Sequence, residues 1–203
     1  MPKPYLLMLL LGATPAIAGD RDAGAARKVT VDFEGFPSGR VPQGFVADVT
    51  GSGAASAWSV VEDDTAPGGK KVLAQTSSDP TDRRFPLCVY EGLRARDFVV
   101  SVRLRPISGE VDRAGGIVWR YRDRENYYVV RANALEGNVV LYKVDKGKRT
   151  DLKPLGAGWS AYGQKVEVPS GRWSELHVEA RGTRHSVSLA GKHLFDVEDD
   201  TFR

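Results

Sequence analysis

Apolar and polar residues alternate over most of this sequence, in short runs that end at Gly, Pro, Asp or Ser. The segment KVTVDFEG, for example, places Val29, Val31 and Phe33 on one side of an extended chain. Segments such as KKVLAQT and FVVSVRLRP repeat this pattern, which is typical of strands with one buried face. No segment keeps a helical spacing of apolar residues over the length of a helix. The sequence therefore predicts an all-β protein of about eleven to thirteen short strands, folded as a two-sheet antiparallel β-sandwich.

The first residues depart from this pattern. Lys3 precedes a short apolar segment, and the small-x-small sequence AIA follows directly at residues 16–18. This order is typical of a cleaved secretory signal peptide, and the apolar segment is shorter than the ~20 residues of a membrane span. We expect a signal peptide over residues 1–18, a flexible lead-in over 19–27 and one domain over 28–203, in a secreted or periplasmic protein. A buried N-terminal helix is the alternative, but no helical pattern continues the segment.

The charge balance argues against a nucleic-acid partner. The sequence has 29 Lys and Arg against 26 Asp and Glu. Cleavage before Gly19 would remove only Lys3, which leaves a net charge of 28 − 26 = +2. Nucleic-acid binding relies on a concentrated basic face, and this balance does not indicate one. The single cysteine, Cys88, excludes an intrachain disulfide and is most simply a small buried apolar residue.

The segment WRYRDRENYYVVRAN, residues 119–133, is rich in arginine and aromatic side chains and reads as a β-hairpin. If Arg122 lies opposite Tyr127 across the turn, cross-strand partners sort into two faces. We expect one face to be core, made of Ile117, Trp119, Tyr121, Tyr128, Val130, Ala132, Val139 and Leu141. The other face would carry Val118, Arg120, Arg122, Tyr127, Val129, Arg131, Asn133, Asn138, Val140 and Tyr142.

The second face is the candidate binding surface. Arginines offer planar hydrogen-bond donors to sugar hydroxyls, and tyrosine rings offer flat apolar surfaces to the C–H faces of a sugar. We therefore predict a poly- or oligosaccharide ligand held by Arg120, Arg131, Tyr127, Tyr142, Asn133 and Asn138. The alternative is a solvated face on which arginine stems cover apolar surface. A register slip of one residue would exchange the two faces.

Two longer segments, AGGIVWRYRDRENYYVVRANALEGNVVLYKVDKGKR and GRWSELHVEARGTRHSVSLAGKHLFDVEDDTF, resemble the concanavalin A-like, laminin-G-like jelly-roll domains of secreted bacterial proteins. They are most similar to the family labelled 3-keto-disaccharide hydrolase, or family 16 glycoside hydrolase-like, and the resemblance spans about residues 29–202. It implies a jelly roll but no single activity, because such folds include lectins, adhesion modules and hydrolases. Jelly rolls of this kind usually close with a further strand. The sequence ends at Arg203, so we expect either a fragment or a sandwich without that strand.

Catalytic and metal-binding motifs are weak. The resemblance implies two glutamates on one strand around an aspartate, and the nearest match is Glu175-x-His177-x-Glu179. On a regular strand the two glutamates are ~13 Å apart, whereas retaining hydrolysis needs carboxyls ~5–5.5 Å apart. We interpret these three residues as a polar outer face. The acidic run at 196–200 offers oxygen ligands for Ca²⁺ but no recognisable ligand spacing, so we expect a solvated turn and no cofactor.

Three functions stay open from the sequence alone. A secreted, non-catalytic carbohydrate-binding module is favoured by the export signal, the arginine-tyrosine face and the missing glutamate motif. A hydrolase of glycosides or 3-keto-disaccharides is the alternative, on resemblance alone. A protein-interaction or adhesion domain is the third. We expect neither a nucleic-acid partner nor a membrane span, and the oligomeric state is not indicated.

Overall fold

The structure is a computed structural model that describes residues 27–156 and 161–203. The predicted signal peptide and residues 19–26 of the predicted lead-in lie outside these ranges. Within them the chain forms thirteen strands and no helix, and every pair of neighbouring strands is antiparallel. No described segment could therefore cross a membrane as a helix. The predicted all-β antiparallel sandwich is confirmed.

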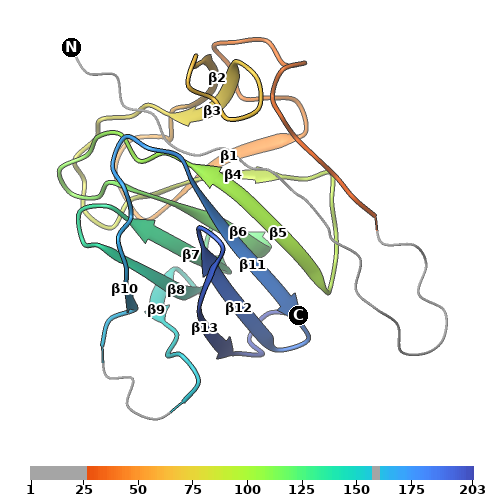
Figure 1. Ribbon diagram of the computed structural model, residues 1–203, viewed down its shortest axis with the longest axis vertical. Coiled ribbons are helices and arrows are strands. Elements are labelled where there is room, and N and C mark those ends of the chain that lie inside the picture. Colours follow the sequence, from red (N-terminus) through yellow and green to blue (C-terminus); the bar gives the residue numbers. More distant parts are fainter. Residues whose placement is uncertain (1–26, 157–160) are drawn as a thin grey trace.

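Two larger sheets face each other (Figure 1). The first has the order β13-β12-β11-β5 and is built from β5 (Phe98–Leu104), β11 (Ser174–Arg181), β12 (Arg184–Leu189) and β13 (Lys192–Glu198). The second has the order β10-β8-β7-β6, with β9 also paired to β8. Its strands are β6 (Ala114–Asp123), β7 (Asn126–Asn133), β8 (Asn138–Asp145), β9 (Lys148–Asp151) and β10 (Gln164–Lys165).

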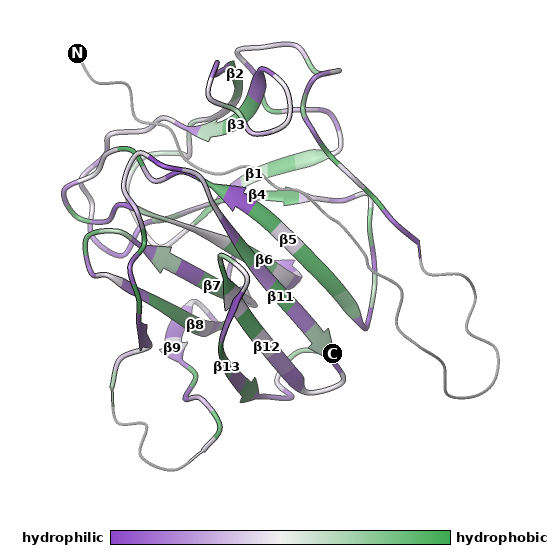
Figure 2. Cartoon of the chain, viewed as in Figure 1, coloured by the Kyte–Doolittle hydropathy of each residue, from purple (hydrophilic) through white to green (hydrophobic). Residues whose placement is uncertain are grey.

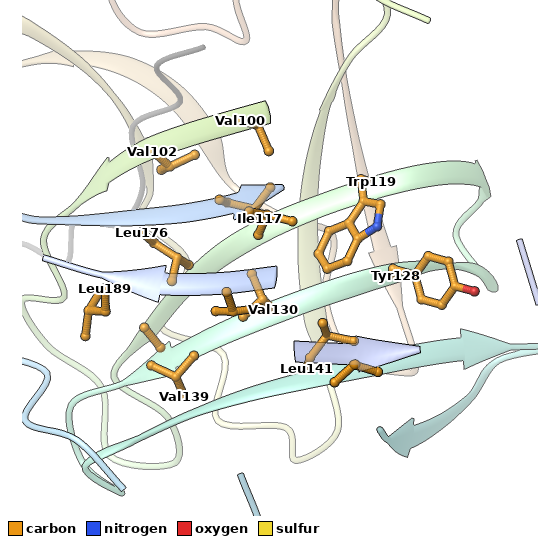
Figure 3. Packing of buried hydrophobic residues seen from close by; sticks show 14 of the residues in the cluster. Val100, Val102, Ile117, Trp119, Tyr128, Val130, Val139, Leu141, Leu176 and Leu189 are labelled. Carbon is orange, nitrogen blue, oxygen red and sulfur yellow. The ribbon is translucent and has the colours of Figure 1, made fainter. Parts of the chain in front are cut away.

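The main core fills the space between these sheets. Hydrophilic and hydrophobic residues alternate along their strands (Figure 2), so each strand turns one row of side chains inward. Trp119 and Tyr128 pack side by side at one end, with ring centroids 5.7 Å apart (Figure 3). Burial of a large apolar side chain contributes roughly 1.5–3 kcal/mol. Seven of the eight predicted core residues lie in this cluster: Ile117, Trp119, Tyr128, Val130, Ala132, Val139 and Leu141.

Two smaller sheets extend the sandwich. They are β1 (Phe45–Thr50) paired with β4 (Phe85–Tyr90), and β2 (Trp58–Glu62) paired with β3 (Lys71–Gln75). Leu87 of β4 packs against Tyr127 and Val144 of the second large sheet. The β1–β4 pair therefore covers part of the face that the sequence predicted to be open.

A bulge in β6 changes the predicted hairpin. Trp119 pairs with Tyr128 and Asp123 with Asn126, so three residues of β6 lie opposite Tyr127 alone. Arg120 adopts a φ of 49° at this bulge, a conformation that a residue with a Cβ rarely takes. The bulge sends the Tyr121 ring to the outer face, where it lies 6.0 Å from the Tyr127 ring. The prediction that Tyr121 is a core residue is therefore wrong.

The same bulge overturns the prediction that Arg120 shares a face with Arg131. The Arg120 guanidinium donates to the carbonyl oxygens of Phe202 at 2.8 Å, Gly182 at 2.6 Å and Arg96 at 3.2 Å. Gly182 lies in the turn between β11 and β12, the two inner strands of the first large sheet, so Arg120 connects the bulge to one end of that sheet. The side chain of Arg120 therefore has a structural role, because its hydrogen bonds connect three chain segments at one end of the sandwich.

Candidate functional site

A groove of about 1170 Å³ runs between β4 and β6. Strand β6 is an edge of the second large sheet, and β4 belongs to the two-stranded β1–β4 sheet that packs against it. Leu87 and Val89 line it from β4, and Val118 lines it from β6. Arg131 and the loop that carries Asp112 line it as well. Apolar walls with a few polar groups are typical of ligand-binding sites.

Two groove residues, Arg131 and Asp112, belong to a network of polar side chains that we call the Arg131 cluster: Arg131, Asp112, Glu136, Asn133 and Asn138. Arg131 donates to Asp112 at 3.0 Å and to Glu136 at 2.5 Å. The Asn133 amide also donates to Asp112, at 2.6 Å, and the Asn138 amide to Glu136, at 2.9 Å. Both asparagines are buried. The cluster therefore holds one guanidinium and two carboxylates in set positions, which lowers the entropy lost when a ligand binds.

Aromatic rings flank the cluster. The Arg131 guanidinium lies 5.7 Å from the Tyr142 ring centre and 5.9 Å from the Tyr162 ring centre, and the two tyrosine hydroxyls are hydrogen-bonded. Burial raises the pKa of Tyr142, and the hydrogen bond with Tyr162 adds to that shift. Tyr142 is thus a neutral, buried side chain that contacts both Arg131 and Tyr162. Tyr162 is 42% exposed and offers its ring to a ligand.

Exposed apolar residues gather at the same place. Among the described residues, five large apolar side chains are exposed, and three of them adjoin the Arg131 cluster: Val111, Leu135 and Tyr162. Val111 precedes Asp112 and Leu135 precedes Glu136 in the chain. These exposed apolar side chains therefore lie beside polar groups of fixed position.

Burial also changes the pKa of one acidic side chain of the cluster, Asp112. It raises the pKa of the Asp112 carboxyl above its usual range, and the charge of Arg131 acts in the opposite direction. The two carboxylates are held by the same guanidinium, so they serve as hydrogen-bond acceptors with their charge partly balanced. This arrangement can accept hydrogen bonds from hydroxyl groups.

The structure brings together four of the six residues predicted to bind a ligand: Arg131, Tyr142, Asn133 and Asn138. Tyr127 also lines the groove but is buried beneath the β1–β4 pair, where its hydroxyl is 2.7 Å from the hydroxyl of Thr50. Arg120 also lines the groove, and its guanidinium is held by the three carbonyl oxygens described above. Sequence reasoning missed Asp112, Glu136, Arg149 and Tyr162, because they come from loops and from β9 and no local motif links them to the hairpin.

The weak catalytic candidates do not reach the groove. Glu175, His177 and Glu179 lie on β11, and no residue of β11 lines the groove. Glu175 is 3.6 Å from the Arg103 guanidinium, and His177 is hydrogen-bonded to Ser101 at 2.9 Å. These side chains point away from the buried row of β11, so the structure places them on a polar outer face.

The carboxylates of the acidic run have protein partners. Asp196 accepts from Arg184 at 2.7 Å, and Asp199 accepts from Tyr128 at 2.6 Å and from Lys143 at 2.7 Å. Within the described ranges, no three His, Cys, Asp or Glu side chains are grouped to hold a metal ion. A calcium ion at residues 196–200 stays an untested hypothesis.

No protein-family model and no curated protein matches this sequence. A solved structure does match the fold: the carbohydrate-binding module CBM66 from Bacillus subtilis, with a TM-score of 0.55 and 18% sequence identity. The match covers 78% of this chain and 81% of that chain. At this identity the likeness shows the fold alone, so the chain is an antiparallel β-sandwich like that module. The resemblance to the 3-keto-disaccharide hydrolase family is not supported by a family match.

Proposed function

We propose that the protein is a carbohydrate-binding module that takes a poly- or oligosaccharide at the Arg131 cluster. One observation carries this proposal: Arg131 is held by Asp112 and Glu136 directly beside the exposed ring of Tyr162. The fold shared with a carbohydrate-binding module supports it.

Each part of the site suits one feature of a sugar. The carboxylates of Asp112 and Glu136 accept hydrogen bonds from sugar hydroxyls. The C–H face of a pyranose or furanose ring covers the Tyr162 ring and the neighbouring apolar side chains. Because the polar groups already bind one another, they need little reordering when the ligand arrives.

We propose binding without hydrolysis. Asp112 and Glu136 are both hydrogen-bonded to Arg131 and to an asparagine, which suits acceptors of fixed position. The glutamates whose spacing approaches the hydrolase motif lie on β11, away from the groove. Release of reducing sugar by the purified protein would contradict this part of the proposal.

Affinity electrophoresis on a panel of plant and bacterial polysaccharides tests the binding site. Tyr162→Ala should weaken retention about tenfold, since an aromatic platform contributes on the order of 1–2 kcal/mol to binding. Its melting temperature should stay close to that of the wild type, because the ring is exposed. Arg184→Ala, which alters an exposed pair with Asp196 outside the groove lining, is the matched control. No retention of folded wild-type protein on any polysaccharide would overturn the proposal.

A further inference from the structure

The groove concentrates positive charge. Its lining residues include four acidic side chains, eight arginines and no lysine, a balance of 8 − 4 = +4. The whole sequence carries +3, so the residues outside the groove sum to 3 − 4 = −1. The eight arginines are Arg83, Arg84, Arg94, Arg120, Arg122, Arg131, Arg149 and Arg203. A cleft of one sign of charge attracts ligands of the other sign.

Arg84, Arg120, Arg131 and Arg203 already donate side-chain hydrogen bonds to protein groups, whereas Arg149 has a different environment. Arg131 is bound by two carboxylates and Arg120 by three carbonyls. The Arg149 guanidinium instead lies between two aromatic rings, 4.2 Å from the ring centre of Phe85 and 4.7 Å from that of Tyr142. In the described part of the chain, no residue accepts a hydrogen bond from it. Its N–H donors are thus held in a set plane and open to a ligand.

We propose that the ligand is a polysaccharide of uronic acids and that Arg149 binds its carboxylate; this inference rests on the proposed function. A guanidinium matches a carboxylate through two parallel hydrogen bonds. Stacking between Phe85 and Tyr142 fixes the orientation of the guanidinium, so little side-chain entropy is lost on binding. The nearby Asp112 does not compete for this role, because Arg131 already pairs with it.

Other arginines extend the basic surface along the groove. Arg83 and Arg94 are exposed, and the exposed Arg122 stacks on the Phe202 ring at 5.1 Å. A polymer with a carboxylate on successive sugars would meet several of these charges at once. A neutral polysaccharide would leave them without a partner.

Isothermal titration with polygalacturonate, alginate and hyaluronan tests this inference. These three polymers present carboxylates on sugars of different stereochemistry, and neutral galactan, mannan and dextran serve as comparison. We expect binding to at least one uronate polymer and about tenfold or more weaker binding to its methyl ester. Raising NaCl from about 0.05 M to about 0.5 M should weaken the interaction severalfold.

Variants of Arg149 test whether its guanidinium binds the carboxylate of the polymer. Arg149→Ala should weaken uronate binding about tenfold or more, and Arg149→Lys should lie in between, because a lysine keeps the charge without the planar fork. Arg184→Ala should bind as the wild type does, and thermal melts confirm that each variant is folded. Binding to neutral polymers only, or uronate binding unchanged in Arg149→Ala, would overturn this inference and leave the proposed function standing. No binding to any polysaccharide would overturn both.

Discussion

His185 is the most unusual single residue of the core. Its imidazole is fully buried, with ring centroids 5.6 Å from Trp119 and 4.8 Å from Tyr128. Burial, and then the charge of Arg120, lowers the pKa of His185 from its ordinary value of 6.5 to about 4. The folded protein therefore holds this side chain neutral at pH values where the unfolded chain would bind a proton.

This shift makes stability depend on pH in a defined window. The neutral form of His185 is favoured by folding, so its contribution is complete above pH 6.5 and is lost as pH falls toward 4. The free energy of unfolding should drop by roughly 3 kcal/mol across this window because of His185 alone. Urea titrations at several pH values measure the drop, and His185→Phe should remove most of it. An equal drop in that variant would show that other groups are responsible.

The sequence correctly predicted that two aromatic residues of the hairpin lie in the core, but it did not predict the direction of every aromatic side chain. Trp119 and Tyr128 follow the alternation of their strands and were placed correctly. Tyr121 was not, because the direction of its side chain depends on the left-handed conformation of Arg120. That conformation is stabilised by carbonyls from three distant segments, and no local pattern encodes them.

Among the elements, β6 carries both the bulge and the strand pairing that places Arg131. Gly116 of β6 lies opposite Arg131 of β7. A Cβ at Gly116 would overlap the carbonyl oxygen of Val130 on the neighbouring strand. The close approach of β6 to β7 therefore requires glycine here.

Gly116→Ala should accordingly lower the free energy of unfolding by about 1–3 kcal/mol, the range for inserting an extra carbon into a packed site. Gly68→Ala is the matched control, because no atom lies within 4 Å of the position of its Cβ. Denaturant melts of the two variants compare them directly. Equal stabilities would show that β6 can move away from β7 at little cost.

The sequence predicted only part of the candidate binding site. The hairpin residues Arg131, Tyr142, Asn133 and Asn138 share a region because strand pairing follows from alternation. Asp112, Glu136 and Tyr162 come from connecting segments, and the alternation of the strands does not predict how these segments lie against the hairpin. Exposed apolar residues next to acidic ones, as at Val111 and Leu135, were the available signal.

Across the whole molecule, three layers produce the groove. The two large sheets enclose the core, and the β1–β4 pair packs over the outer face of β7 and β8 through Leu87, Tyr127 and Val144. The result is a cleft with apolar walls and several arginines along it, and the Arg131 cluster lies beside the exposed Tyr162 ring.

Hydrogen–deuterium exchange with a bound polysaccharide tests most directly whether this place is the binding site. With the polysaccharide that retains the protein best, amide exchange should slow in the segments that hold Asp112, Glu136 and Arg149. Exchange in β11, which carries Glu175 and Glu179, should not change. Protection confined to β11 and its neighbours, with none around Arg131, would contradict the account and place the ligand on the opposite sheet.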